Sequence, residues 1–277
     1  MNIAIIGLGL IGGSLAKAIK KNTDNFVFGY DIDNTVLYKA KLLDAIDTEL
    51  DTSKLKECDM VIAALYPDET VKFIKDNLDN FKENAIITDC CGIKEKICKE
   101  IRPLLQDRSF SFIGVHPMAG REYSGFDYAK GDLFNNASVI LTPFEDIDIV
   151  RLETTKHFFS KIGFSSIVLT SPKEHDRIIA YTSQLAHIVS NAFVKSPAAK
   201  SFKGYSAGSF KDLTRVARLN EKLWSDLFLN NRKNLINELE TIISNLNEYK
   251  VALENSDDDI LKKLLKEGTD IKNQIDP

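Results

Sequence analysis

The segment GVHPMAGREYSGF, residues 114–126, concentrates residue types that could carry out acid–base chemistry. His116 is followed by a proline and then by a glycine-rich loop, so both its backbone and its side chain are expected to be held stiffly. An imidazole with an ordinary pKa of about 6.5 can take a proton from a hydroxyl group at neutral pH. Loss of that proton would favour departure of a hydride from the carbon that bears the oxygen. The segment therefore predicts the base of a hydride-transfer reaction.

The other three histidines are weaker candidates for such a base. His157 lies on a predicted helix, where a surface or packing role is expected. His175 falls in the first turn of another predicted helix, beside two acids, and is expected to be exposed. His187 follows Ser183 by four residues in YTSQLAHIVSNA, so the two side chains share a helix face. Taken alone, His187 on this apolar helix would be a core residue more often than a ligand.

A second group of residues, GLGLIGGS at 7–14, indicates a binding site for a cofactor that could accept that hydride. It fits the pattern G-x-G-x-x-G through Gly7, Gly9 and Gly12, and it follows a predicted strand and opens a predicted helix. Gly7 permits a tight turn, Gly9 lets the backbone approach a pyrophosphate, and Gly12 lets helix and strand pack closely. The turn therefore predicts a dinucleotide site.

The neighbours of this turn favour NAD over NADP. The backbone N–H groups at the helix start, with Leu10 and Ile11, would face the phosphates. Asp31 ends the next predicted strand and could accept hydrogen bonds from both ribose hydroxyls, while its charge would repel a 2′-phosphate. No arginine occurs at 32–35 to neutralise such a phosphate.

Strands and helices alternate along the first 170 residues. This alternation predicts βαβ units and a Rossmann-type, doubly wound parallel sheet, an α/β fold. His116 would then stand at the carboxyl edge of the sheet, where open α/β sheets bind ligands. The predicted strands cover 2–6, 25–31, 59–65, 84–90, 110–116, 137–143 and 164–170, and the predicted helices include 11–21, 68–79, 93–105 and 147–161.

Beyond residue 170 the pattern is purely helical, which predicts a nucleotide-binding domain at 1–170 and a helical domain at 171–277. Ser171, Pro172 and Glu174 have the types expected of an N-cap, a first turn and a capping partner. Residues 221–253 predict one amphipathic helix, about 45–50 Å long at 1.5 Å per residue. A helix of that length cannot bury its apolar stripe within one small domain, so a subunit interface is expected. A last helix is predicted at 255–268, with Gly268 as its C-cap.

Composition excludes several other classes of protein. The 277 residues carry a net charge of −4 with no basic stripe, which argues against nucleic acid. No apolar run approaches the roughly 20 residues of a membrane span, and the apolar N-terminus predicts a first strand in place of a signal peptide. The four cysteines form no CxxC pair, so we expect reduced thiols in a cytoplasmic protein and no metal site.

Five motifs, taken together, resemble those of prephenate dehydrogenases of the TyrA family. GLGLIGGSLAKA, TDCCGIK, GVHPMAGREYSGF, YTSQLAHIVSNA and GSFKDLTRVA occur in order and span almost the whole chain. The combination of HPMAG-x-E with SQL-x-H is the specific part of the match. The resemblance implies a Rossmann domain followed by a helical dimerisation domain, a homodimer, and NAD-dependent oxidative decarboxylation of prephenate to 4-hydroxyphenylpyruvate on the route to tyrosine.

The same resemblance assigns roles to individual side chains. His116 would be the base, and Arg215 in DLTRVA would bind a substrate carboxylate through its planar guanidinium. His187 and Ser183 would bind the substrate side chain, and Glu122 would line the mouth of the site, although an exposed loop acid fits Glu122 equally well. Lys94 would place a charge near substrate or cofactor, or would be a surface lysine at a helix start. Trp224 corresponds to an aromatic residue near the site but is expected first in the core.

One position departs from the family's pattern. Many members read D-x-G-S-x-K where this chain has DCCGIK at 89–94, so Gly92 replaces a serine that contacts the histidine and the substrate hydroxyl. Cys91 or a water molecule could substitute for it. Because that serine orients the base and is not itself the base, we expect the site to tolerate the loss.

Alternatives to prephenate dehydrogenase remain open at this level. Arogenate dehydrogenase, or a dual-specificity cyclohexadienyl dehydrogenase, would differ only in a side-chain pocket that sequence does not reveal. A non-catalytic NAD sensor is disfavoured by the presence of His116 and Arg215. A β-hydroxyacid dehydrogenase, which uses a lysine of its helical domain, is disfavoured by the HPMAG and SQL-x-H motifs. Because residues 257–277 predict one helix and a polar tail, we expect no tyrosine feedback through an added regulatory domain, and direct competition by tyrosine at the active site stays open.

Overall fold

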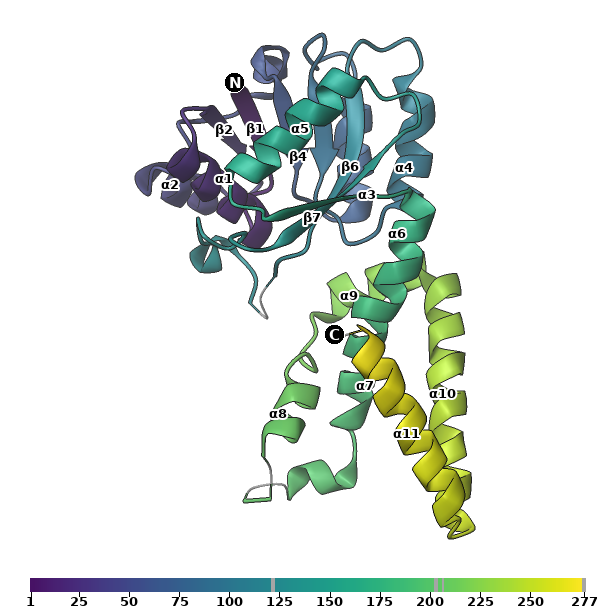
Figure 1. Cartoon of the computed structure of the whole chain (residues 1–277). Coiled ribbons are helices and arrows are strands. Elements are labelled where there is room, and N and C mark those ends of the chain that lie inside the picture. The colour runs from purple at the N-terminus through teal and green to yellow at the C-terminus, as the bar shows by residue number, and fades with distance from the viewer. Residues whose placement is uncertain (121–122, 202–203, 206, 276–277) are drawn as a thin grey trace.

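The computed structural model describes residues 1–120, 123–201, 204–205 and 207–275. The first part of the chain forms one eight-stranded sheet in the order β3-β2-β1-β4-β5-β6-β7-β8 (Figure 1). The strands are β1 (Asn2–Ile6), β2 (Phe26–Tyr30), β3 (Thr48–Glu49), β4 (Met60–Ala63), β5 (Ile86–Asp89), β6 (Ser111–Pro117), β7 (Ser138–Pro143) and β8 (Ser166–Leu169). All seven predicted strands are present, and the two-residue β3 was not predicted.

The sheet departs from the predicted all-parallel arrangement at its last two strands, β7 and β8. β1 to β6 run parallel, whereas β7 pairs antiparallel with β6, with His116 opposite Ile140. β8 then runs parallel to β7. The connection from β6 to β7 contains only the short 3-10 helix Phe126–Tyr128 among its described residues, whereas parallel neighbours are usually joined through a crossover α-helix.

Helices cover both faces of the sheet, as a doubly wound fold requires. One buried cluster joins Ile3 and Ile5 to apolar residues of α1, α2 and α5, and the other joins Ala4 and Ile6 to residues of α3 and α4. Adjacent strand residues therefore serve opposite cores, because successive side chains of a strand point to opposite faces. The helices are α1 (Leu10–Asn22), α2 (Asn34–Leu42), α3 (Pro67–Asp76), α4 (Glu95–Ile101) and α5 (Ile149–Lys161).

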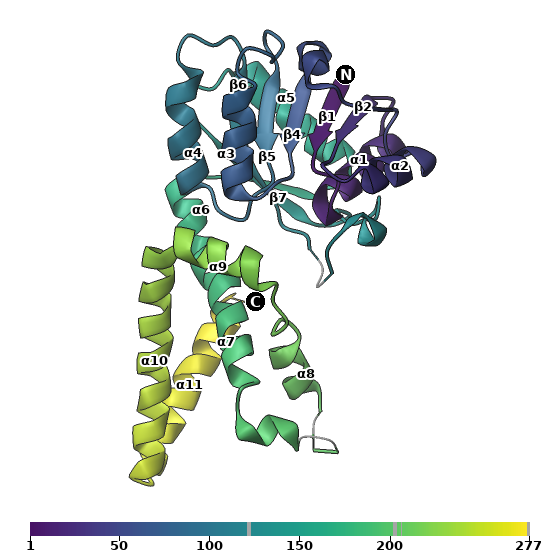
Figure 2. The same cartoon turned by 180° about the vertical axis from the view of Figure 1, so that it is seen from behind.

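The remaining part of the chain is helical and extends away from the sheet (Figures 1 and 2). Ser171 caps α6 by accepting a hydrogen bond from the Glu174 N–H, as predicted. α6 continues through a π-helical segment, Ala180–Leu185, into α7, and α10 and α11 form a long helical hairpin. The helices are α6 (Pro172–Ile179), α7 (Ala186–Phe193), α8 (Gly208–Thr214), α9 (Glu221–Asn230), α10 (Arg232–Glu254) and α11 (Asp258–Ile275).

Two predictions about the C-terminal helices were wrong. The predicted single helix over 221–253 is broken at Asn231, whose backbone leaves the helical region at φ −113° and ψ 19°. The Asn231 side chain instead donates to the Asp176 carbonyl, at 2.8 Å, and to Gln184 Oε1, at 2.9 Å. Gly268 does not cap a helix but lies inside α11, whose amphipathic sequence carries the helix past it.

The carboxyl ends of β1, β4, β5 and β6 lie along one edge of the sheet, and the helical part stands beside that edge (Figure 2). α9 and α6 are the elements that meet it, since Leu227 packs in the core cluster of α3 and α4 and α6 contacts α4. None of the helices in the described ranges combines the length and apolar character needed to cross a bilayer.

Candidate active site

The glycine turn after β1 has the geometry of a pyrophosphate cradle. Gly7 has φ +88°, and a Cβ there would lie 2.6 Å from the Ala64 carbonyl oxygen. A Cβ on Gly12 would lie 1.8 Å from the Gly7 oxygen, whereas a Cβ on Gly9 would meet no described atom within 4 Å. Gly9 is the N-cap of α1, and no side chain of the described residues caps this end, so the first N–H groups, beginning with those of Leu10 and Ile11, have no partner within the helix. This surface fits an anion.

Asp31 stands at the end of β2 beside that turn. Its Oδ2 accepts the Leu8 N–H at 2.7 Å and its Oδ1 accepts the Asp33 N–H at 3.0 Å. Each carboxylate oxygen has a second lone pair that can accept a ribose hydroxyl. The residues present therefore fit an NAD adenosine ribose next to the pyrophosphate.

The loop that follows β6 packs against the nucleotide turn. The Lys130 N–H donates to Ser14 Oγ at 2.9 Å, and the Phe126 ring would lie 2.6 Å from a Cβ built on Gly13. His116, near the end of β6, therefore shares one edge of the sheet with the glycine turn. It is partly exposed, whereas its neighbours Val115 and Pro117 are buried.

His116 is linked to two residues of α6. His116 Nδ1 lies 2.9 Å from His175 Nε2, and His175 Nδ1 lies 2.7 Å from Asp176 Oδ1. Burial, followed by the nearby His175 and Lys94, holds the pKa of His116 well below its usual value. Burial also lowers the pKa of His175, although Asp176 opposes that shift. His116 is therefore neutral, and able to accept a proton, at neutral pH.

The prediction that His175 is exposed was wrong. Only 2% of its surface is accessible, because α6 packs against α4 and β7 and the His175 ring lies against His116 of β6. Asp176 is equally buried and accepts the backbone N–H groups of Lys94, at 2.7 Å, and Glu95, at 2.9 Å. Asp176 thus acts as the hydrogen-bond acceptor at the start of α4, where the N-cap residue, Lys94, makes no side-chain cap of its own.

Lys94 lies behind the histidines, fully buried, so the surface-lysine alternative is excluded. Its ammonium pairs with Asp89 Oδ2, and Asp89 also accepts the N–H groups of Cys91 and Val115, each at 3.0 Å. Asp89 thereby joins the β5–α4 turn to β6 next to His116. The ammonium is near enough to His116 and His175 for its charge to lower the pKa of both imidazoles.

The position of the missing serine faces the base. A Cβ on Gly92 would lie 3.9 Å from His116 Nε2 and 3.5 Å from the Leu227 side chain. Cys91 does not substitute for the serine, because its Sγ lies 3.5 Å from Thr70 Oγ1 and 3.4 Å from the Leu65 carbonyl oxygen, inside the core. Burial also raises the pKa of the Cys91 thiol strongly.

His187, on α7, forms a second polar group in the helical part. Its Nδ1 donates to the Ser183 carbonyl at 2.8 Å, and its ring stacks on Trp224 with centroids 3.9 Å apart. Ser183 thus acts here through its backbone, in the π-helical segment. Trp224 is only partly buried and packs against the core cluster of α3 and α4. Burial lowers the pKa of His187, and the positive charge of Arg215 lowers it further, which places Arg215 near this ring.

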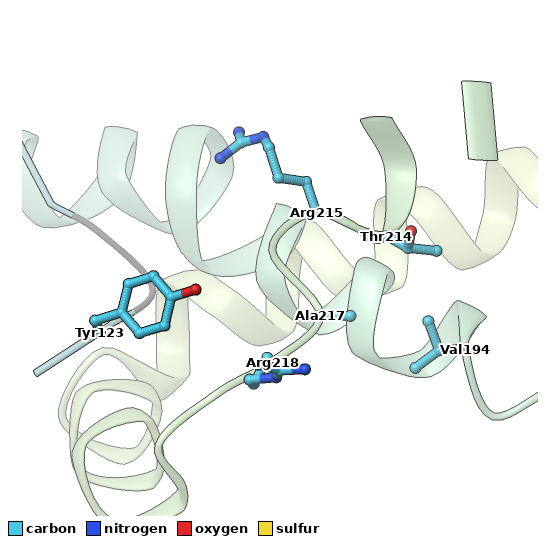
Figure 3. A pocket seen from close by; sticks show the side chains of 6 residues that line it. All are labelled: Tyr123, Val194, Thr214, Arg215, Ala217 and Arg218. Atoms are coloured by element: carbon cyan, nitrogen blue, oxygen red, sulfur yellow. The ribbon is translucent and has the colours of Figure 1, made fainter. Parts of the chain in front are cut away.

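Arg215 lines a cavity of about 510 Å³ together with Tyr123, Thr214 and Arg218. Figure 3 shows the Tyr123 hydroxyl turned toward the segment that carries both arginines. Two guanidinium groups and a phenol suit an anionic organic molecule. Glu122, predicted at the site mouth, lies outside the described residues.

The structure adds Asp176, Asn231, Asp89 and His175 to the residues around the base. One signal in the sequence could have found two of them, because the dipeptide His175–Asp176 places a carboxylate next to an imidazole at the start of a helix. The contribution of Asn231 depends on a helix break that has no proline or glycine to mark it.

A glycine turn fitted to a dinucleotide, with a neutral histidine on the same sheet edge, defines a nicotinamide-dependent oxidoreductase. A family model described as prephenate dehydrogenase, nucleotide-binding domain, matches residues 15–168, and one described as prephenate dehydrogenase, dimerization domain, matches residues 171–267. This chain belongs to the prephenate dehydrogenase family and is an NAD-dependent enzyme.

Individual relatives agree with this assignment. The prephenate dehydrogenase of Bacillus subtilis is 31% identical over 99% of this chain and 76% of its own, and the cyclohexadienyl dehydrogenase of Zymomonas mobilis is 32% identical over 96% and 93%. Among solved structures, the prephenate dehydrogenase of A. aeolicus in complex with hydroxyphenyl propionate and NAD+ has a TM-score of 0.87 at 31% identity, covering 100% of this chain and 98% of that one. Synechocystis arogenate dehydrogenase follows at 0.84 and 26%, covering 99% and 100%.

Proposed function

We propose that His116 is the base in the oxidative decarboxylation of prephenate to 4-hydroxyphenylpyruvate. The observation that carries this proposal is the placement of a neutral imidazole at the carboxyl edge of the sheet, the same edge that carries the glycine turn, with Nε2 facing the space next to Gly92. A base at that position needs access to a hydroxyl group, and the absent side chain at Gly92 leaves room for one.

The reaction follows from the chemistry of the groups. His116 Nε2 takes the proton of the ring hydroxyl, and the C–H bond at the same carbon breaks as the carbonyl forms. NAD, when bound, accepts that hydride. The bond between the ring and its carboxylate then breaks, its electron pair moves through the ring to the carbonyl oxygen, CO2 leaves, and the ring becomes aromatic, which provides the driving force. The resulting phenolate oxygen takes the proton back from His116, which gives the phenol of the product and regenerates the base.

We assign substrate binding to the second polar group. Arg215 binds the carboxylate of the pyruvyl side chain, and His187, held by the Ser183 carbonyl, offers Nε2 to the same side chain. Lys94 acts by its charge on the histidines. Glu122 stays a predicted residue of the site mouth. Gly7, Gly9, Gly12 and Asp31, with the N–H groups at the start of α1, hold the dinucleotide.

We propose that two copies of the chain associate through α10 and α11. Several large apolar side chains on these helices are 52–64% exposed, namely Ile243, Leu246, Leu265, Ile271 and Ile275. Exposed apolar area of this kind marks an interface, and the family model of this region is described as a dimerization domain. Sedimentation should give a dimer, whereas a variant combining Leu246→Glu with Leu265→Glu should sediment as a monomer.

The division of the chain at about residue 170 also remains our proposal. It is supported by the end of the sheet at Leu169 and the start of α6 at Pro172. Cys58, Cys90, Cys91 and Cys98 are all free thiols, which supports a reducing, cytoplasmic location.

The test of the proposed reaction is NADH formation with prephenate and with arogenate side by side, each with and without tyrosine. We expect turnover of prephenate with NAD and a much lower kcat/KM for arogenate. Preference for arogenate would overturn the substrate assignment, and absence of turnover with both would overturn the reaction. The His157→Gln variant, altered at an exposed histidine of α5, should match the unaltered enzyme.

A further inference from the structure

We propose that His175 and Asp176 are positioning residues that fix the tautomer of His116, so that Nε2 carries the lone pair and Nδ1 carries the proton. This inference rests on the proposed role of His116 as the base. A neutral imidazole can carry its proton on either nitrogen, so naming His116 as the base does not say which of its nitrogens accepts the proton.

Asp176 is the fixed end of the hydrogen-bonded row His116–His175–Asp176. Its two oxygens accept the backbone N–H groups of Lys94 and Glu95, so the carboxylate already serves as an acceptor. The Asn231 amide, at the break between α9 and α10, donates to the Asp176 backbone carbonyl. A carboxylate held in this way can only accept from His175 Nδ1, which lies 2.7 Å from Oδ1. His175 Nδ1 therefore carries a proton.

The proton on His175 Nδ1 determines the next contact. Neutral His175 then has its lone pair on Nε2, which lies 2.9 Å from His116 Nδ1. Two lone pairs facing each other would repel, so His116 Nδ1 must carry a proton and donate it to His175. The lone pair of His116 is left on Nε2, the nitrogen that faces the space beside Gly92.

The row also prepares the site for the charge that forms during reaction. When His116 takes a proton at Nε2, its Nδ1–H becomes a stronger donor, and His175 and Asp176 already occupy the accepting side. The other charged groups facing these rings are Lys94, whose charge disfavours protonation of both, and Asp89, whose charge favours protonation of His175. Asp89 and Lys94 pair with each other, so Asp176 is the carboxylate aligned with the row.

The row crosses the junction between the two parts of the chain. His116 belongs to β6 of the sheet, whereas His175 and Asp176 belong to α6 of the helical part. The base in its competent tautomer is therefore assembled from both parts, and neither part supplies it alone.

The primary experiment reads the tautomer directly, with no substrate present. Protein labelled with 15N in its four histidines is examined by NMR at neutral pH, and the His116 signals are identified by their loss in the His116→Asn variant. We expect Nδ1 of His116 to be protonated and Nε2 to be unprotonated. A proton on Nε2 would overturn the proposal, whether or not the enzyme turns over prephenate, so the result is independent of the proposed reaction.

Kinetics of matched variants supply the second readout. In His175→Phe the acceptor is lost, and we expect kcat to fall on the order of 10²-fold with little change in KM, because His175 does not touch substrate. In His175→Gln an amide oxygen can accept the same proton, so most of kcat should return and the His116 tautomer should be preserved. His157→Gln on α5 is the control and should change neither. A kcat in His175→Phe equal to that of the unaltered enzyme would overturn the proposal, as would a Gln variant no better than Phe. If the Phe variant does not fold, the Gln variant and the NMR spectrum still decide.

Discussion

Replacement of Lys94 by methionine tests how the buried charges around the base are balanced. The side chains of Lys94 and Asp89 are both fully inaccessible to solvent, and methionine preserves most of the lysine volume. Removing one partner of a buried ion pair costs about 3–5 kcal/mol, because the other charge is left without compensation. Asp89 keeps the N–H groups of Cys91 and Val115, each at 3.0 Å, which places the expected loss near the lower end, about 3 kcal/mol.

The same substitution has a predicted effect on the histidines. The charge of Lys94 lowers the pKa values of His116 and His175, so its removal should raise both. Because the base form of His116 exists only above its pKa, the acidic limb of kcat/KM should move to higher pH in the variant.

The assay combines urea unfolding at one fixed protein concentration with a pH profile of prephenate turnover. Lys96→Met is the matched control, since Lys96 forms a pair with the exposed Asp68 that should be worth at most about 1 kcal/mol. A Lys94→Met variant that loses no more stability than the control, with an unmoved acidic limb, would refute the reasoning about this ion pair.

Four further predictions follow from the site. His116→Asn should lower kcat about 10²–10⁴-fold with binding largely kept; unchanged turnover in initial-rate measurements would remove His116 as the base. Arg215→Ala should mainly raise the KM for prephenate, and an unaltered KM would move carboxylate binding elsewhere. Asp31→Ser should weaken the preference for NAD over NADP, measured as the ratio of the two kcat/KM values, and a constant ratio would refute the ribose assignment. His116 and His175 have lowered pKa values in the folded state, so the unfolded chain binds more protons below about pH 6.5. The free energy of unfolding should therefore fall there by up to about 1.4 kcal/mol per pH unit per histidine. Urea unfolding at pH 7 and pH 5.5 checks this, and equal stabilities would contradict it.

Local patterns in the sequence were sufficient to predict most of the fold. The strand–glycine–helix pattern at residues 7–14 and the alternation up to residue 170 gave the sheet, because each element is marked by its own periodicity and end signals. The antiparallel β7 was missed because strand direction depends on the chain path between strands. The break at Asn231 was missed because its cause is a set of hydrogen bonds to α6 and the π-helical segment, which are distant in sequence.

The candidate site was predictable only where the residues of one part of it lie together in a single sequence motif. His116 and the glycine turn were found in this way. His175 was assigned to the surface, since the first turn of a helix is often exposed, and it is buried by the packing of α6 against α4 and β7. Lys94 was predicted to lie near substrate or cofactor because the sequence does not reveal that it pairs with Asp89. That pair is buried only once the strands have assembled into the sheet.

The most direct test of the account is a crystal structure of the enzyme with NAD+ and hydroxyphenylpropionate, a phenol that can stand in for the ring and side chain of the substrate. The account predicts the phenol oxygen within hydrogen-bond reach of His116 Nε2, about 2.6–3.2 Å, with the propionate carboxylate on Arg215. A phenol oxygen bound away from Nε2, or a ligand bound in the opposite orientation, would contradict the claim that this imidazole removes the hydroxyl proton.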